Sequence, residues 1–261
     1  MISGGLADGL VLNYAKGFSA RDLRFLQDLP IRRLHVLDRA LNDLGPVYSL
    51  ASTLTALRVQ TDPQTPLDLD RLPLVTALSV GWSQIQGSLR YAPQLERLFI
   101  LSYSEEDLTP LTVAPNLVRV VMKDYPRVRS LNGLEGLPWL AELGIHVAQR
   151  LEDISAVERL ASPILTTLEL ASCRQISDLS AVSACSALSF FDASEGGDLP
   201  SASFLAGLEQ LEGLYLYGST RVLDGDLRPI AELPRLTDFR MQNRRHYSPS
   251  VKEIQEAISR R

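Results

Sequence analysis

A pair of apolar residues separated by one position recurs along the chain and limits its possible folds more than any other feature. Clear copies are Leu57-Arg58-Val59, Leu98-Phe99-Ile100 and Leu168-Glu169-Leu170. Eleven copies, from Leu10-Val11-Leu12 to Phe239-Arg240-Met241, follow one another at intervals of 20 to 25 residues. A period of this length indicates a repeat architecture in which each unit packs mainly against its two neighbours.

Each unit has the same internal pattern. The alternation within the pair predicts a short strand with one buried face. A second apolar series with a spacing of three follows the pair, as in Leu131, Leu134 and Leu137. This spacing predicts a 3₁₀ or helical turn with one edge inward. Because proline cannot donate to a strand ladder, prolines before the next strand mark the unit boundaries: Pro30, Pro73, Pro93, Pro115, Pro138, Pro163 and Pro234.

The pattern resembles the leucine-rich repeat, whose signature L-x-x-L-x-L-x-x-N/C-x-L is met at Leu165, Leu168, Leu170 and Cys173. The resemblance covers roughly residues 5–245, and the short units are similar to the internalin-like and SDS22-like subclasses of bacterial stand-alone repeat proteins. It implies a single α/β solenoid of about eleven repeats, shaped as a curved horseshoe. Parallel strands would line the concave face, and short 3₁₀ or helical turns would form the convex face.

The asparagine position of the family signature departs from the family. It is held by Arg39, Asp62, Ser83, Tyr103, Tyr125, Ala148, Cys173, Gly196, Ser219 and Arg244. In the family, a ladder of asparagines satisfies backbone groups at the turn after the strand. We therefore expect hydroxyl groups, water or irregular turns to satisfy those groups here. We also expect a less regular curve, and the sequence defines the register of individual units only to within a residue or two.

The sequence predicts different structures at the two ends of the array. We assign residues 1–247 to the repeat array and 248–261 to a C-terminal capping helix, because Ser250 and Glu253 have capping-box spacing. One apolar stripe of this helix would cover the last repeat: Val251, Ile254 and Ile258. Little precedes the first repeat. We expect a monomer, with self-association through that edge as the alternative.

No motif for catalysis or metal binding is found in the sequence. Metalloprotease, paired-cysteine, nucleophile-elbow and phosphate-loop patterns are lacking, and the acidic clusters at 105–107 and 224–226 lack the spacing of a calcium loop. Cys173 occupies a narrow inward slot where a thiol behaves as a small apolar group, and Cys185 falls on the outer apolar series. We expect no enzyme activity, no cofactor and no metal.

Charge and hydropathy narrow the range of partners. A net charge of −5 is unsuited to sequence-independent binding of nucleic acid or to an anionic membrane surface. No apolar run reaches the roughly 18 residues needed to span a bilayer. The first seventeen residues lack the pattern of a signal peptide. With only two cysteines, the sequence predicts a reduced, cytoplasmic protein.

The predicted concave face carries the best candidates for function. Basic side chains gather in the first six units, acidic ones in the seventh to ninth, and aromatic ones lie among them. Arginine and aromatic residues anchor protein interfaces, whereas polar residues on a strand face are also commonly just solvated. The predicted partner-binding residues are Arg58, Trp82, Arg97, Phe99, Arg119, Lys123, His146, Glu169, Phe190, Asp192, Tyr215, Tyr217 and Arg240.

These features predict a protein–protein interaction module that binds an unidentified protein in its concave face. By resemblance, an inhibitor or immunity-type protein is one version of this hypothesis. A structural scaffold subunit is the alternative. An effector enzyme is disfavoured, because the repeats occupy almost the whole chain. Trp139, just before the seventh strand, is expected to pack rather than to contact a partner.

Overall fold

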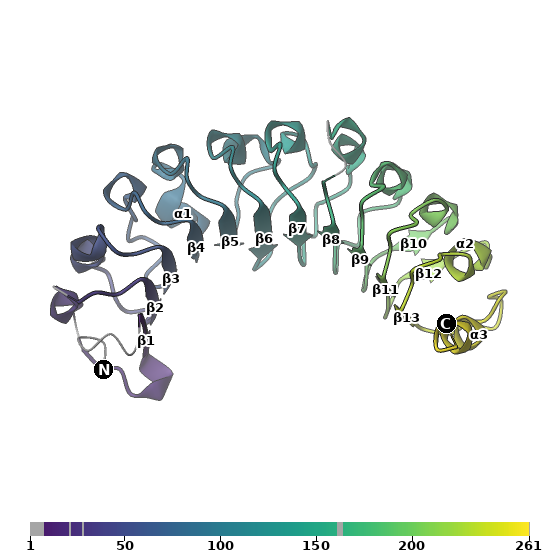
Figure 1. Cartoon of the computed structure of the whole chain (residues 1–261), viewed down its shortest axis with the longest axis horizontal. Helices are drawn as coiled ribbons and strands as arrows, with labels where there is room; N and C mark the ends of the chain where they lie inside the picture. The colour runs from purple at the N-terminus through teal and green to yellow at the C-terminus, as the bar shows by residue number, and fades with distance from the viewer. Residues whose placement is uncertain (1–7, 21, 28, 161–163, 261) are drawn as a thin grey trace.

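The computed structural model describes residues 8–20, 22–27, 29–160 and 164–260. Within these residues the repeats follow one another in a single arc, with the strands on the inner side and the turns on the outer side (Figure 1). The expectations about residues 1–7 and Pro163 fall outside the described residues. The predicted leucine-rich-repeat solenoid is confirmed.

The inner side of the arc is a parallel sheet of eleven strands within the described part of the chain. Every strand contains the first residue of one of the recurring apolar pairs. The strands are β1 (Gly9–Asn13), β2 (Arg33–Leu37), β3 (Ala56–Gln60), β4 (Ala77–Gly81), β5 (Arg97–Leu101), β6 (Arg119–Lys123), β7 (Glu142–Ile145), β8 (Thr167–Glu169), β9 (Phe190–Asp192), β11 (Gly213–Leu216) and β13 (Asp238–Met241).

Neighbouring strands pair without any shift of register. Leu34 lies opposite Leu57, which in turn lies opposite Leu78. These side chains point into the core, where Leu57 is 2% exposed and Val59 is fully buried. A slip of one residue would move every apolar side chain of a strand to the solvent face, so burial of the pair fixes the register. The residue between the two members of each pair must then face the concave side.

The outer side of the arc consists mainly of 3₁₀ turns, as the spacing of three predicts. Leu131, Leu134 and Leu137 are buried there. The turns are η1 (Tyr14–Lys16), η2 (Arg24–Leu26), η3 (Gly45–Leu50), η4 (Leu69–Arg71), η5 (Leu89–Tyr91), η6 (Thr109–Val113), η7 (Leu134–Gly136), η8 (Ser155–Arg159), η9 (Ser180–Ala184) and η10 (Ser203–Leu205), with the short α-helices α1 (Trp82–Ile85) and α2 (Arg228–Ala231).

A side-chain oxygen begins many of these turns by accepting a hydrogen bond from the backbone N–H two residues later. In Asp178, for example, Oδ1 accepts from Ser180 N at 2.7 Å. The same bond recurs in six successive units, at Asp107, Ser130, Asp153, Asp178, Ser201 and Asp226. These local turns fix the direction of the chain as it enters the convex side.

The exit from the strands is also regular, although the asparagine ladder is missing. Two residues after the second member of the pair, the backbone adopts a positive φ in six successive units, at Ser102, Asp124, Val147, Ser172, Glu195 and Gly218. A left-handed residue turns the chain sharply away from the sheet. The turn is therefore kept by backbone conformation rather than by one residue type.

Different side chains satisfy the backbone in the place of the asparagines. The hydroxyl of buried Tyr103 donates to Asp107 O at 2.8 Å, and the hydroxyl of Thr220 donates to Ala193 O at 2.7 Å. Gln84 Nε2 donates to Thr65 O at 2.9 Å. Gln84 and Thr220 stand one residue beyond the expected slot, so in these two units the side chain that replaces the asparagine lies one residue later than the signature places it.

Two features complete the C-terminal half. A second parallel pair, β10 (Asp198–Leu199) and β12 (Arg221–Val222), lies beyond the main sheet and was not predicted. The chain closes with helix α3 (Val251–Ile258), whose capping box between Ser250 and Glu253 is confirmed. Val251 and Ile254 are buried, and Gln255 Nε2 donates to Phe239 O at 3.0 Å, so α3 covers the last repeat. Among the described residues, no helix has the length and apolarity needed to traverse a bilayer.

The left-handed slot leads to a test of the fold. Val147 holds a φ of 61°, which is strained for a β-branched residue. We expect Val147→Asn to raise the free energy of unfolding by about 0.5–1 kcal/mol, because asparagine tolerates this conformation. In the same slot, Gly218→Val should lower it by about 1–2 kcal/mol. Urea unfolding followed by circular dichroism measures both changes, and a Val147→Asn variant less stable than the parent would contradict this account.

Candidate functional site

The register of the sheet builds the candidate site on the concave face. The residues between the pair members lie side by side as one row, because His35 pairs with Arg58, Glu169 with Asp192, and Tyr215 with Arg240. Of the predicted site residues, six are exposed: Arg58, Arg97, Arg119, Lys123, Tyr217 and Arg240. Six others are half-buried: Phe99, His146, Glu169, Phe190, Asp192 and Tyr215.

Trp82 is the exception, and its predicted place on the binding surface is wrong. It begins α1 directly after β4, and this turn carries its side chain into the core, where it is 3% exposed. Its ring packs edge-on against Tyr103 with 4.6 Å between ring centroids. Its Nε1 donates to Glu105 Oε1 at 2.8 Å. Trp82 therefore links two repeats and cannot contact a partner.

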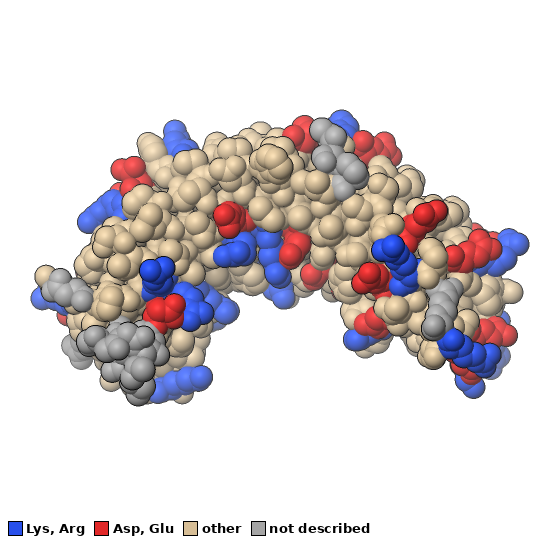
Figure 2. All heavy atoms as spheres, in the orientation of Figure 1, with Lys and Arg blue, Asp and Glu red and all other residues tan. Residues whose placement is uncertain are grey.

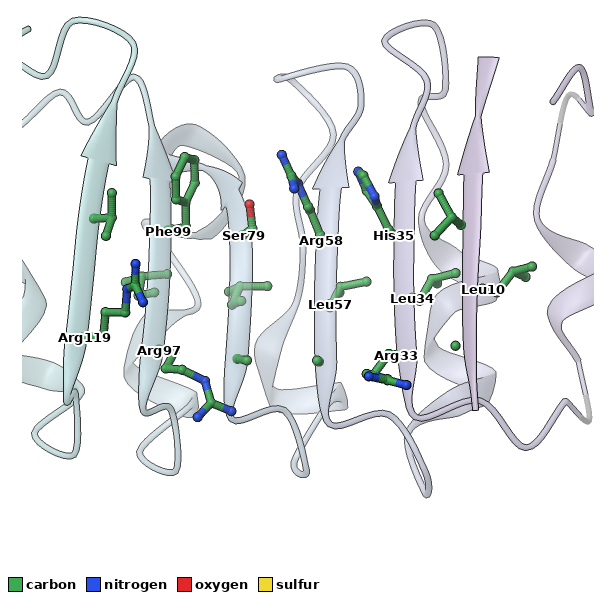
Figure 3. Close-up of a pocket in the computed structure, with 17 residues that line it drawn as sticks. Leu10, Arg33, Leu34, His35, Leu57, Arg58, Ser79, Arg97, Phe99 and Arg119 are labelled. Atoms are coloured by element: carbon green, nitrogen blue, oxygen red, sulfur yellow. The ribbon is translucent and has the colours of Figure 1, made fainter. Parts of the chain in front are cut away.

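The N-terminal half of the concave face is basic and hollowed. A hollow of about 680 Å³ runs over β1–β6 and is lined by Arg33, Arg58, Arg97 and Arg119, together with apolar residues. Figure 3 shows Arg33, Arg97 and Arg119 in one row and His35, Arg58 and Phe99 in a second row nearer the strand ends. The side chains of both rows therefore reach a common space.

Basic and acidic side chains meet in the middle of the arc. Figure 2 shows their atoms next to one another along the inner rim over β5–β8. Here Arg119 Nη1 lies 3.1 Å from Glu142 Oε2 in an exposed ion pair. The predicted charge gradient thus has a neutralised boundary between β6 and β7.

Beyond this boundary, His146 and Glu169 form a polar contact of 3.3 Å between Nε2 and Oε2. Burial lowers the pKa of His146, and the nearby Lys123 lowers it further. Burial and the neighbouring Asp192 raise the pKa of Glu169. Because the pKa of His146 is lowered, its imidazole is mainly neutral at pH 7, and the contact with Glu169 is a polar contact rather than a full ion pair.

The C-terminal half carries a pre-ordered aromatic cluster. Phe190 and Tyr215 pack edge to face with 4.9 Å between ring centroids. The Arg240 guanidinium lies 4.4 Å from the centroid of the Tyr215 ring. Asp238 joins them, because its Oδ2 accepts from the Tyr215 hydroxyl at 2.5 Å and lies 3.1 Å from Arg240 Nη2. These contacts hold the rings in place before any partner binds.

The cysteines are part of the core. Cys173 and Cys185 are free thiols that are 2% and 3% exposed. Cys173 Sγ donates to Ile145 O at 3.4 Å. Burial raises the pKa of Cys173 to about 12 and that of Cys185 to about 11. Both are therefore protonated at neutral pH and poor nucleophiles.

One surface residue was misjudged from the sequence. Trp139, expected to pack, is 61% exposed. It lines a second hollow at the edge where the chain enters the strands, together with Val118 and Ile164. Trp139 lies in the turn that precedes β7 (Glu142–Ile145), and this turn leaves its side chain outside while Leu140 is fully buried. Among the described residues, no group of three or more His, Cys, Asp or Glu side chains is placed to hold a metal ion.

No protein-family model matches the sequence, and no curated protein matches it either. Among solved structures, it is similar to the functional domain of InlJ from Listeria monocytogenes, which includes a cysteine ladder, with a TM-score of 0.59 and 19% identity. It is also similar to a TDR receptor, with a TM-score of 0.56 and 16% identity. The chain has the leucine-rich-repeat fold.

The extent of the match differs between the chains. The InlJ alignment covers 85% of this chain and 47% of that one, and the receptor alignment covers 91% and 47%. The chain therefore spans about half the length of each of these proteins. At this level of identity the likeness concerns the fold of the array. InlJ includes a cysteine ladder, whereas the two cysteines of this chain, Cys173 and Cys185, lie in a single repeat.

The state of the thiols is directly testable. We expect iodoacetamide at pH 8 to leave Cys173 and Cys185 unmodified in the folded chain, since burial keeps both thiols protonated. Both should react after unfolding in guanidinium, as mass spectrometry would show. The Cys173→Ala variant should lose about 1–2 kcal/mol of stability. Rapid labelling of Cys173 in the folded chain would contradict its assignment to the core.

Proposed function

We propose that this protein is a recognition module that binds a protein partner on its concave face. The observation that carries the proposal is the row arrangement itself. The unshifted register places arginine and aromatic side chains side by side across an exposed sheet face. Arginine, tyrosine and tryptophan are over-represented among the residues that dominate binding energy at protein interfaces.

The state of the side chains supports this proposal. Phe190, Tyr215 and Arg240 are already held in mutual contact, so less conformational entropy is lost when a partner covers them. The basic half and the acidic centre favour a partner with the opposite order of charges, which also fixes its orientation. Neither cysteine offers a reactive thiolate, and we propose no catalytic role.

The proposal includes a biological role and a location for the protein. An inhibitor or immunity-type role is supported by the sequence resemblance to stand-alone bacterial repeat proteins, and a cytoplasmic location by the two free cysteines. A scaffold role is the second candidate function. It is favoured by exposed Trp139 and the hollow at the strand-entry edge, because an assembly subunit would use an edge as well as the concave face.

A double charge reversal tests the use of the concave face. Arg58→Glu combined with Glu169→Lys should reduce capture of the partner from native lysate at least ten-fold, because one charge is reversed in the basic part of the concave face and one in its acidic part. The melting curve of the variant should stay close to that of the parent. Quantitative mass spectrometry of the captured proteins measures the effect.

The matched control reverses two exposed charges away from the concave face, Arg90→Glu with Glu209→Lys. It should capture the partner as the parent does. Equal capture by the concave variant would contradict the proposal. Loss of capture in a Trp139→Ala variant instead would move the site to the edge and favour the scaffold role.

A further inference from the structure

The hollow over β1–β6 combines an apolar floor with a basic rim. One row of the concave face consists of the residues just before each apolar pair. In this row, Ala56 and Ala77 stand between Arg33 and Arg97, because the register places these four residues on successive strands. The short alanine side chains leave space between the long arginines. Exposed Val11 and half-buried Phe99 add apolar surface from the other row, which is formed by the residues between the pair members.

The lining of the hollow contains four arginines and no aspartate or glutamate. This contrasts with a net charge of −5 for the whole chain. Three of the arginines contact carboxylates outside the lining, with Arg33 at 2.6 Å from Asp8, Arg97 at 3.9 Å from Glu96 and Arg119 at 3.1 Å from Glu142. Their side chains are 67%, 59% and 50% exposed, so these pairs are weak and easily exchanged for a ligand.

Arg58 is different from the other three arginines. It forms no ion pair or hydrogen bond with any residue that the structure describes. It lies beside His35 in the second row, and its charge contributes to lowering the pKa of His35. The guanidinium therefore has no carboxylate partner in the described part of the chain, and a carboxylate bound in the hollow would supply one.

The dimensions of the hollow fit a short extended peptide. Adjacent strands lie about 4.8 Å apart, so the distance from β1 to β6 is roughly 24 Å. An extended chain advances about 3.3–3.6 Å per residue, so about seven residues would cross it. Side chains alternate along such a peptide, and therefore an apolar residue can face the alanine floor while its neighbours reach the arginines.

We propose that this hollow binds an acidic peptide segment of the partner, with carboxylates on Arg33, Arg58, Arg97 and Arg119 and an apolar side chain over Ala56 and Ala77. This rests on the proposed function, because it specifies the ligand of that same face. A nucleic acid strand is less well matched. It carries a phosphate at every step and needs stacking platforms, whereas the hollow offers an apolar floor and one aromatic ring.

The probe is a random dodecapeptide display library selected on the full chain, followed by fluorescence anisotropy with the enriched peptides. Ala77→Phe fills the floor without changing charge, and Arg58→Glu inverts the unpaired charge. Arg90→Glu, on exposed turn η5, is the matched control. Fluorescein-labelled oligothymidylate of the same length is the nucleic acid probe. Circular dichroism verifies that each variant is folded.

We expect enriched peptides that carry acidic residues around one apolar residue. Their affinity should fall at least ten-fold in Ala77→Phe and in Arg58→Glu, stay unchanged in Arg90→Glu, and weaken with added salt. Basic or neutral enriched peptides, a lack of enrichment, equal binding by Ala77→Phe, or tighter binding of oligothymidylate would each overturn the proposal.

Partner capture separates this proposal from the broader one. If the single variant Glu169→Lys loses the partner while Arg58→Glu retains it, the concave face binds but the hollow does not, and only the peptide proposal falls. If both single variants retain the partner and the double charge reversal does too, the proposed function itself falls.

Discussion

The unshifted stacking of one apolar pair per repeat is the constraint on which the rest of the structure depends. A single repeat cannot bury Leu57 and Val59 alone, but a stack of repeats makes one continuous core from them. Since the pair must point inward, the residue between its members must point outward. The order of side chains on the concave face is therefore fixed by the core, strand by strand.

This constraint gives the face its functional character. Residues far apart in sequence, such as Glu169, Asp192 and Tyr215, become neighbours on adjacent strands. Side chains of adjacent repeats are linked by the Arg119–Glu142 ion pair, the His146–Glu169 polar contact and the Phe190–Tyr215 ring contact. Side chains that are already held in mutual contact lose less conformational entropy when they are covered, which supports the proposed use of this face for recognition.

The strands, their register and the rows of the concave face could be predicted from the sequence, because they depend only on the alternation within each pair. The errors fall where the chain leaves a strand or enters one. Trp82 follows β4 at a turn whose direction depends on α1, and Trp139 lies in the turn that precedes β7. Residues as different as Ser102 and Val147 adopt the same left-handed conformation, so this turn cannot be recognised from residue type. The short β10–β12 pair was not recognised from the sequence either.

We propose that the concave rows, and not an edge, hold the partner. Hydroxyl-radical footprinting of the chain, free and with its captured partner, tests it at single residues. The account predicts protection of Phe99, Tyr215 and Tyr217 in the complex, with unchanged reactivity at Trp139, which is 61% exposed. Protection of Trp139 with no change at the concave aromatic residues would contradict it.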